Sequence, residues 1–115
     1  GAVQVKIEEN AAYYKMPAPK TGFIIHSYRQ DEIGPRLAAR FAEGRKLNGA
    51  PSTLNVGGRE AVISLYTAKD AAGENMVWVA ALYPKSGLLI VANLPAKDYA
   101  GAKEWIGALV RGVRF

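Results

Sequence analysis

The 115-residue sequence contains no cysteine, which excludes disulfides, thiolate metal sites, cysteine nucleophiles and thiol redox switches within the chain. It also contains a single histidine, His26, so an imidazole-based metal or catalytic site would depend on that residue alone. No pair of carboxylates is spaced like a catalytic dyad. We therefore expect no catalytic residue, no metal site and no cofactor.

Long apolar runs are absent as well. The longest, Met76–Tyr83, is far shorter than the roughly 20 residues that a membrane-spanning helix requires, so we expect no membrane span. Hydrophobic residues make up 50% of the chain and charged residues 22%, as is typical of a globular protein. At this length we expect one domain, residues 1–115.

The net charge of +5 could suggest a nucleic-acid partner. The Lys and Arg residues are scattered, however, and no basic run of five occurs. The densest basic group is Arg36, Arg40, Arg45 and Lys46. Asp31, Glu32 and Glu43 dilute its charge, which argues against nucleic acid as a partner.

The first residue is Gly1, from which we expect a processed N-terminus or a remnant of a removed tag. The cysteine-free composition is compatible with export. We predict a periplasmic or secreted bacterial protein and leave a cytoplasmic location open.

Two strands are predicted in the first half. Val3–Ile7 alternates apolar and polar residues, which indicates a strand with one solvent-facing side, and residues 22–28 are rich in β-branched and aromatic residues. Between them, Ala11–Thr21 contains Pro17 and Pro19, so we expect a loop or a short edge segment.

The second half predicts an antiparallel meander of about four strands from Thr53 onward. Gly57-Gly58 is typical of a two-residue hairpin turn. The two long apolar strands, Met76–Tyr83 and Leu88–Asn93, are joined by a short turn that contains Pro84 and Gly87.

Helical periodicity is present in two segments, Asp31–Glu43 and Asp98–Arg111. In the second segment, Tyr99, Ile106 and Leu109 share one apolar face that can pack on the two long strands. These patterns predict an α+β fold: one domain with a curved antiparallel β-sheet of five to seven strands, covered by two helices, the last of them C-terminal.

The segment Val56–Phe115 resembles the C-terminal half of the PsbP-like fold family. The resemblance is carried by Val56-Gly57-Gly58-Arg59-Glu60-Ala61, the paired long strands, the Gly-led strand of residues 87–92, and the helix that closes on Val110–Phe115. It covers about half the chain, and the first half departs from the family pattern. It implies an antiparallel sheet covered by helices and a non-catalytic role in binding or assembly, and it transfers no catalytic residue.

Aromatic and basic residues supply the candidate binding site. If one sheet face is incompletely covered, side chains from several strands can form an amphipathic patch for a ligand or partner. The candidate residues are Tyr13, Tyr14, Tyr28, Arg29 and Arg59.

We therefore predict a non-enzymatic accessory or binding protein that acts on a protein or a small apolar ligand through a sheet face or the Tyr13–Lys20 loop. One alternative is a small enzyme or enzyme subunit that uses His26 with a carboxylate brought near by folding. The other is a single-stranded nucleic-acid-binding module. Pairing of two copies through Val3–Ile7 would give a homodimer.

Overall fold

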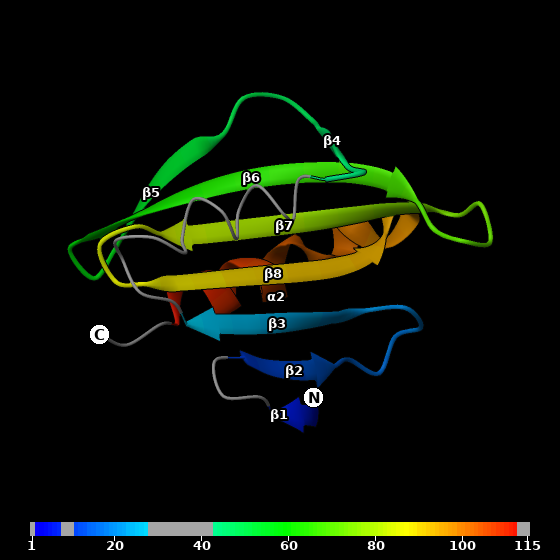
Figure 1. The fold of residues 1–115 in the computed structure, drawn as a ribbon, viewed down its shortest axis with the longest axis horizontal. Coiled ribbons are helices and arrows are strands. Elements are labelled where there is room, and N and C mark those ends of the chain that lie inside the picture. The colour runs from blue at the N-terminus through cyan, green and yellow to red at the C-terminus, as the bar shows by residue number, and fades with distance from the viewer. Residues whose placement is uncertain (1, 8–10, 28–42, 113–115) are drawn as a thin grey trace.

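The computed structural model describes residues 2–7, 11–27 and 43–112, which form one antiparallel sheet of eight strands and a C-terminal α-helix (Figure 1). The strand order is β1-β2-β3-β8-β7-β6-β4, and β5 also pairs with β6. The strands are β1 (Val3–Ile7), β2 (Ala11–Lys15), β3 (Gly22–Ser27), β4 (Lys46–Leu47), β5 (Ser52–Val56), β6 (Arg59–Lys69), β7 (Asn75–Tyr83) and β8 (Leu88–Pro95).

The centre of the sheet is the hairpin of β7 and β8, in register from Met76 opposite Pro95 to Tyr83 opposite Leu88. Both strands are apolar on successive residues because both of their faces are largely buried. The meander β5-β6-β7-β8 confirms the expected order.

The β5–β6 turn confirms the role expected of the two glycines. Gly57 and Gly58 have φ angles of 57° and 82°, the left-handed conformation that a two-residue type I′ hairpin turn requires at both central positions. The Asn55 side chain accepts a hydrogen bond of 3.0 Å from the Gly58 N–H, which stabilises the turn.

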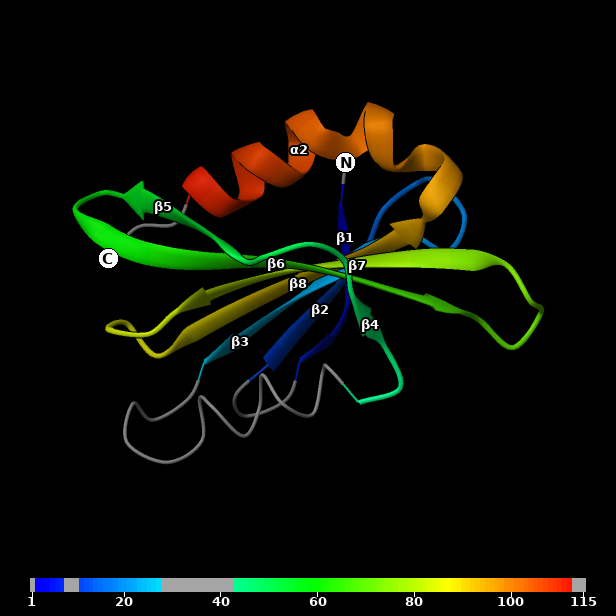
Figure 2. The same cartoon turned by 90° about the horizontal axis from the view of Figure 1, so that it is seen from above.

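Helix α2 (Tyr99–Arg111), preceded by the 3₁₀ turn η1 (Ala96–Asp98), lies across one face of the sheet (Figure 2). Ala102 and Ile106 are buried in the same cluster as Phe23, Val77 and Leu94. Tyr99, Trp105 and Leu109 pack against that cluster, so the expected contact between the closing helix and the long strands is confirmed. Each buried side chain of Ile or Leu size contributes about 1.5–3 kcal/mol, so the helix is part of the core.

The opposite face has an apolar cluster of its own. Ala80, Leu89 and Val91 are buried there, and Tyr66, Trp78 and Leu82 pack against them. The Arg45 guanidinium lies 4.4 Å from the centre of the Trp78 ring, a cation–π contact that joins the segment before β4 to this face.

The expected strand number was too low. The structure adds the short strand β4, and Ala11–Lys15 is the regular strand β2 rather than a loop. The two prolines lie after the end of β2, where the missing proline N–H interrupts no pairing. The helix expected over Asp31–Glu43 lies outside the described residues, except for Glu43, which is in a turn.

Candidate binding site at the β1 edge

Strand β1 forms one edge of the sheet, and all five of its residues are exposed. Val3, Val5 and Ile7 are 63%, 60% and 69% exposed, the highest values among the large apolar residues of the described part of the chain. Leu47, 42% exposed, belongs to the same group but lies on β4. Three large apolar side chains on one short strand form a concentrated apolar edge.

A β-bulge explains why this edge does not follow simple alternation. Gln4 lies opposite Tyr14 and Lys6 opposite Tyr13, so Val5 is an extra residue between two consecutive pairs. A bulge increases the local twist and re-aims the side chains beside it. The expectation of one solvent-facing side was therefore wrong, because both sets of alternating residues on β1 are exposed.

Tyr14 belongs to the helix-covered face. Its ring stacks on Phe23 at a centroid distance of 4.7 Å, and the Phe23 ring lies 6.3 Å from that of Trp105 on α2. The Gln4 side-chain amide donates a hydrogen bond of 3.1 Å to the Tyr14 hydroxyl. These contacts make Tyr14 a packing residue that anchors β2 and β1 under the helix.

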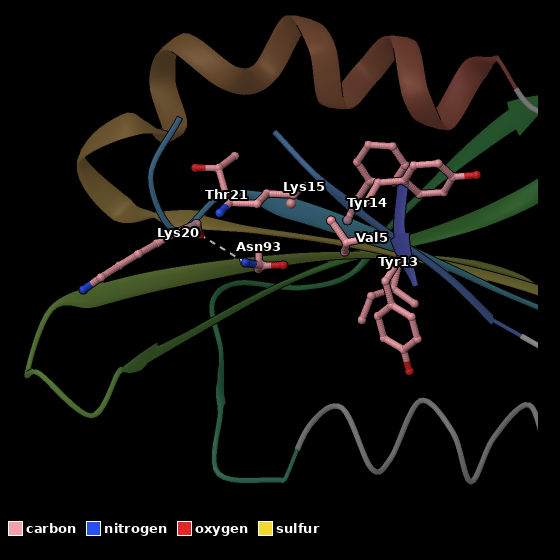
Figure 3. A pocket seen from close by; sticks show the side chains of 10 residues that line it. Val5, Tyr13, Tyr14, Lys15, Lys20, Thr21 and Asn93 are labelled. Carbon is pink, nitrogen blue, oxygen red and sulfur yellow. Dashed lines mark hydrogen bonds between the residues drawn. The ribbon is translucent and has the colours of Figure 1, made fainter. Parts of the chain in front are cut away.

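Tyr13 points to the opposite side of the sheet, away from α2 (Figure 3). It is half-buried, and the Lys6 ammonium lies 5.4 Å from the centre of its ring. The contact places a positive charge and an aromatic face together beside the apolar edge.

A surface depression of about 320 Å³ adjoins this edge, where β1, β2 and β3 meet the loop between β2 and β3 (Figure 3). Half of the ten residues that line it are aromatic or aliphatic, and two lysines and an asparagine are among the others. The lining residues are Val5, Tyr13, Tyr14, Lys15, Lys20, Thr21, Gly22, Phe23, Ile24 and Asn93.

Gly22 shapes the floor of this depression. It lies between Lys15 of β2 and Asn93 of β8 in the pairing of the strands. A Cβ atom at this position would lie 2.5 Å from the Tyr14 carbonyl oxygen, closer than real Cβ contacts come. The close approach of β2 and β3 therefore requires glycine here.

An ion-pair cluster holds the loop beside the depression. Lys20 Nζ donates to Asp70 Oδ2 at 2.7 Å and to Glu74 Oε1 at 2.8 Å, which joins the β2–β3 loop to the β6–β7 loop. Lys20 has a φ of 57°, an uncommon conformation for a residue with a side chain. The Asn93 side-chain amide donates to the Lys20 carbonyl oxygen at 3.1 Å and fixes that conformation (Figure 3).

These hydrogen bonds shift the pKa values of Lys20 and Asp70. Hydrogen bonds to Asp70 and Glu74 raise the pKa of Lys20 to about 12. The hydrogen bond from Lys20, followed by that from the Glu74 backbone N–H, lowers the pKa of Asp70 below its usual value of 3.8. Both groups are charged at neutral pH, so their ion pair holds the two loops together. We call Lys20, Asp70 and Glu74 together the Lys20 clasp.

The structure brings together only part of the predicted patch. Tyr13 and Tyr14 are neighbours but lie on opposite faces, while Tyr28 and Arg29 lie outside the described residues. Arg59 begins β6, which three strands separate from β2, and its Nη1 lies 3.4 Å from Ser86 Oγ. Arg59 therefore does not border the tyrosines, and that expectation was wrong.

His26 lies on β3, opposite Ala11 on one side and Leu89 on the other, and is half-buried. It does not line the depression at Tyr13. Within the described ranges, no group of three or more His, Asp or Glu side chains is placed to hold a metal ion.

The expectation that Val3–Ile7 is an open edge strand is confirmed by the strand order, but the exposure of both of its sides and the Lys20 clasp were missed. The alternation of Val3, Val5 and Ile7 was a signal, but it indicated a buried side that the bulged edge does not have. The clasp joins residues 50 and 54 positions apart in the chain, so no local pattern marks it.

The fold and this edge define a small α+β domain with an open apolar strand at one side of its sheet. No protein-family model matches the sequence, and neither does any curated protein. One solved structure that it resembles is PA94 from Pseudomonas aeruginosa, described as a protein of unknown function and a candidate regulator. The TM-score is 0.67 at 15% identity, and the alignment covers 99% of this chain and 96% of that one, which shows a shared fold. In the described part of the chain, no helix is both long and apolar enough to cross a membrane.

Proposed function

We propose that this chain is a non-enzymatic binding protein that takes up a protein partner at the β1 edge. The observation that carries the proposal is the exposure of Val3, Val5 and Ile7 on one edge strand. Exposed apolar strands at sheet edges are templates for pairing with another chain, and proteins usually cover or charge them. A partner that covers this edge removes three large apolar side chains from water.

The adjoining depression also supports binding of a protein partner at the β1 edge. Tyr13 and Val5 border both the edge and the depression, so one partner can contact both features. Tyrosine combines a large apolar surface with a polar end, which suits it to interfaces. Lys20 also lines the depression, and its hydrogen bonds to Asp70, Glu74 and Asn93 hold that part of the surface in place before a partner binds.

Four further expectations from the sequence stay predictions. These are the enzyme that uses His26, the single-stranded nucleic-acid-binding module, the periplasmic or secreted location and the PsbP-like membership. PA94 itself is described as a candidate regulator. That description of PA94 agrees with the binding role proposed for this chain.

The proposal is tested by capturing partners from an extract of the source organism on three immobilised proteins. These are the wild type, a triple variant with serine at Val3, Val5 and Ile7, and the variant Leu47→Ser. Leu47 is the matched control, because it is an exposed apolar residue on a strand that pairs with the far side of β6.

The expected result is a partner retained by the wild type and by Leu47→Ser but lost by the triple variant. Retention by all three proteins would place the binding surface elsewhere and overturn the proposal. So would the absence of any retained protein. Circular dichroism and urea unfolding of the three proteins verify that the folds are intact.

A further inference from the structure

We infer that the occupant of the β1 edge and the adjoining depression is an extended segment of another protein that carries an apolar residue and, two positions away on the same face, an Asp or Glu. This inference rests on the proposed function and specifies the chemistry of the partner. It combines the open edge, the bulge and the distribution of lysines around the depression.

An extended segment fits the edge because β1 has a paired strand on one side only, in the strand order of the described residues. A segment added there continues the sheet through main-chain hydrogen bonds, while its alternate side chains reach the two faces. Because of the bulge, Val3 lies opposite Lys15 on the Tyr13 side and Ile7 lies opposite Ala12 on the other side, so exposed apolar side chains of β1 are available on both faces.

The bulge limits how much the backbone alone can contribute. It interrupts the ladder between Gln4 and Lys6, so a regular added strand can match β1 only over a short stretch. Side chains must therefore supply recognition, and the depression beside Val5 and Tyr13 is the place for an apolar side chain of the partner.

Charge identifies the second element of the partner. Lys6 lies opposite Tyr13, and Lys15 lies two residues further along β2, so both lysines belong to the Tyr13 side of the sheet. Lys15 is exposed and lines the depression, and no ion pair joins it to any carboxylate of the described ranges. A carboxylate two residues from the apolar side chain of the partner lies on the same face and would meet this ammonium group.

Lys20 cannot take that role, because its ammonium already binds Asp70 and Glu74. This leaves Lys15 as the specificity-determining cation at the rim of the depression. The net charge of +5 further favours association with an acidic segment.

A second copy of the chain fits less well. Antiparallel pairing of two β1 strands about Val5 would place the bulge of one copy opposite the bulge of the other. It would also bring together two chains that each carry a net charge of +5. The two copies would share apolar side chains but supply no carboxylate to Lys15 from β1, whose sequence is Val-Gln-Val-Lys-Ile.

The inference is tested with a displayed library of random short peptides panned on the wild-type protein, followed by synthesis of the enriched sequence. We expect enriched peptides to carry an Asp or Glu two positions from an apolar residue. Val5→Lys should abolish binding of the synthetic peptide, and Lys15→Glu should weaken it by about tenfold or more. Replacing the acidic residues of the peptide with lysine should restore binding to Lys15→Glu.

Lys69→Glu is the matched control, because it makes the same charge change at an exposed residue of β6 and should leave binding unchanged. Enriched peptides without acidic residues that still require Val5 would overturn this inference and leave the proposed function standing. Failure to enrich any peptide would also overturn it, while the capture experiment decides the proposed function separately. A dimer in analytical ultracentrifugation that Val5→Lys dissociates would make a second copy the occupant and overturn the inference.

Discussion

The Tyr83 hydroxyl donates a hydrogen bond of 2.6 Å to the carbonyl oxygen of Val110, so the end of strand β7 holds the last turn of helix α2. Tyr83 is fully buried, and Val110 belongs to the same apolar cluster. A helix leaves its final carbonyl groups without partners inside the helix. Here a side chain of the sheet supplies one of those partners and joins the last turn of the helix to β7.

Tyr83→Phe removes this bond and leaves a buried carbonyl oxygen without its donor. We expect the free energy of unfolding to fall by about 1–2 kcal/mol, measured by urea unfolding, with an unchanged dependence on urea concentration. A variant as stable as the wild type would show that the bond does not hold the helix.

Burial raises the pKa of the Tyr83 phenol to about 12, from an ordinary value of 10.0. A group whose pKa is raised in the folded state stabilises the fold fully below the unfolded value and loses that contribution above it. We therefore expect the wild type to lose stability between about pH 10 and pH 12 more steeply than Tyr83→Phe does. Unfolding midpoints of the two proteins over this range measure the difference, and parallel pH profiles would contradict the assignment.

Gly22→Ala places a methyl group 2.5 Å from the Tyr14 carbonyl oxygen, a backbone atom that cannot move alone. We expect a loss of about 1–3 kcal/mol in the free energy of unfolding as β2 and β3 separate. Gly101→Ala is the control: a Cβ there meets nothing within 4 Å, and alanine in a helix should be neutral or stabilising by up to about 1 kcal/mol. Equal destabilisation by the two substitutions would contradict the close approach at Gly22.

The Lys20 clasp predicts a shift that can be measured at one carboxyl group. The carboxyl of Asp70 should titrate below 3.8 in the wild type, and in Lys20→Met its pKa should rise toward 3.8. Because the pKa of Asp70 is lowered, its contribution to stability is present above the unfolded value and disappears as pH falls through the folded value. Carbon-detected NMR titration of the two proteins tests this, and identical titration curves would show that the clasp does not persist in solution.

Nucleic-acid binding should be weak. Arg59 and Lys69 stand at opposite ends of β6, and Lys20 and Lys97 both lie beside Glu74. These cations do not form a continuous track for phosphates. We expect a single-stranded DNA oligonucleotide to bind with an affinity weaker than about 10⁻⁴ M at low salt, by fluorescence anisotropy. Tight binding that added salt weakens steeply would favour the nucleic-acid alternative.

The sequence was sufficient for the parts of the fold that depend on local patterns. Gly57-Gly58 specifies its turn through the φ angles it can adopt, and the helical period of Tyr99, Ile106 and Leu109 identifies the face that packs on the strands. The β7–β8 hairpin follows from two apolar runs and a short connection. In each case the determining residues are close together in the chain.

The candidate site depends on relationships that no short segment contains. Whether Val-Gln-Val-Lys-Ile is an edge or a central strand is decided by the strands that pair with it, and the bulge depends on its register with β2. Pro17 and Pro19 suggested a loop around Tyr13 and Tyr14, but the strand ends before them. Lys20 meets Asp70 only because the two hairpin loops lie at the same end of the sheet.

The central claim is that the β1 edge is the surface that a protein partner covers. Amide hydrogen exchange of the chain, measured with and without the captured partner, tests this most directly, because main-chain groups of a covered edge exchange more slowly. The account predicts added protection in Val3–Ile7 and at Tyr13, with little change in α2 and β6. Protection confined to α2 or β6, with unchanged exchange in β1, would contradict it.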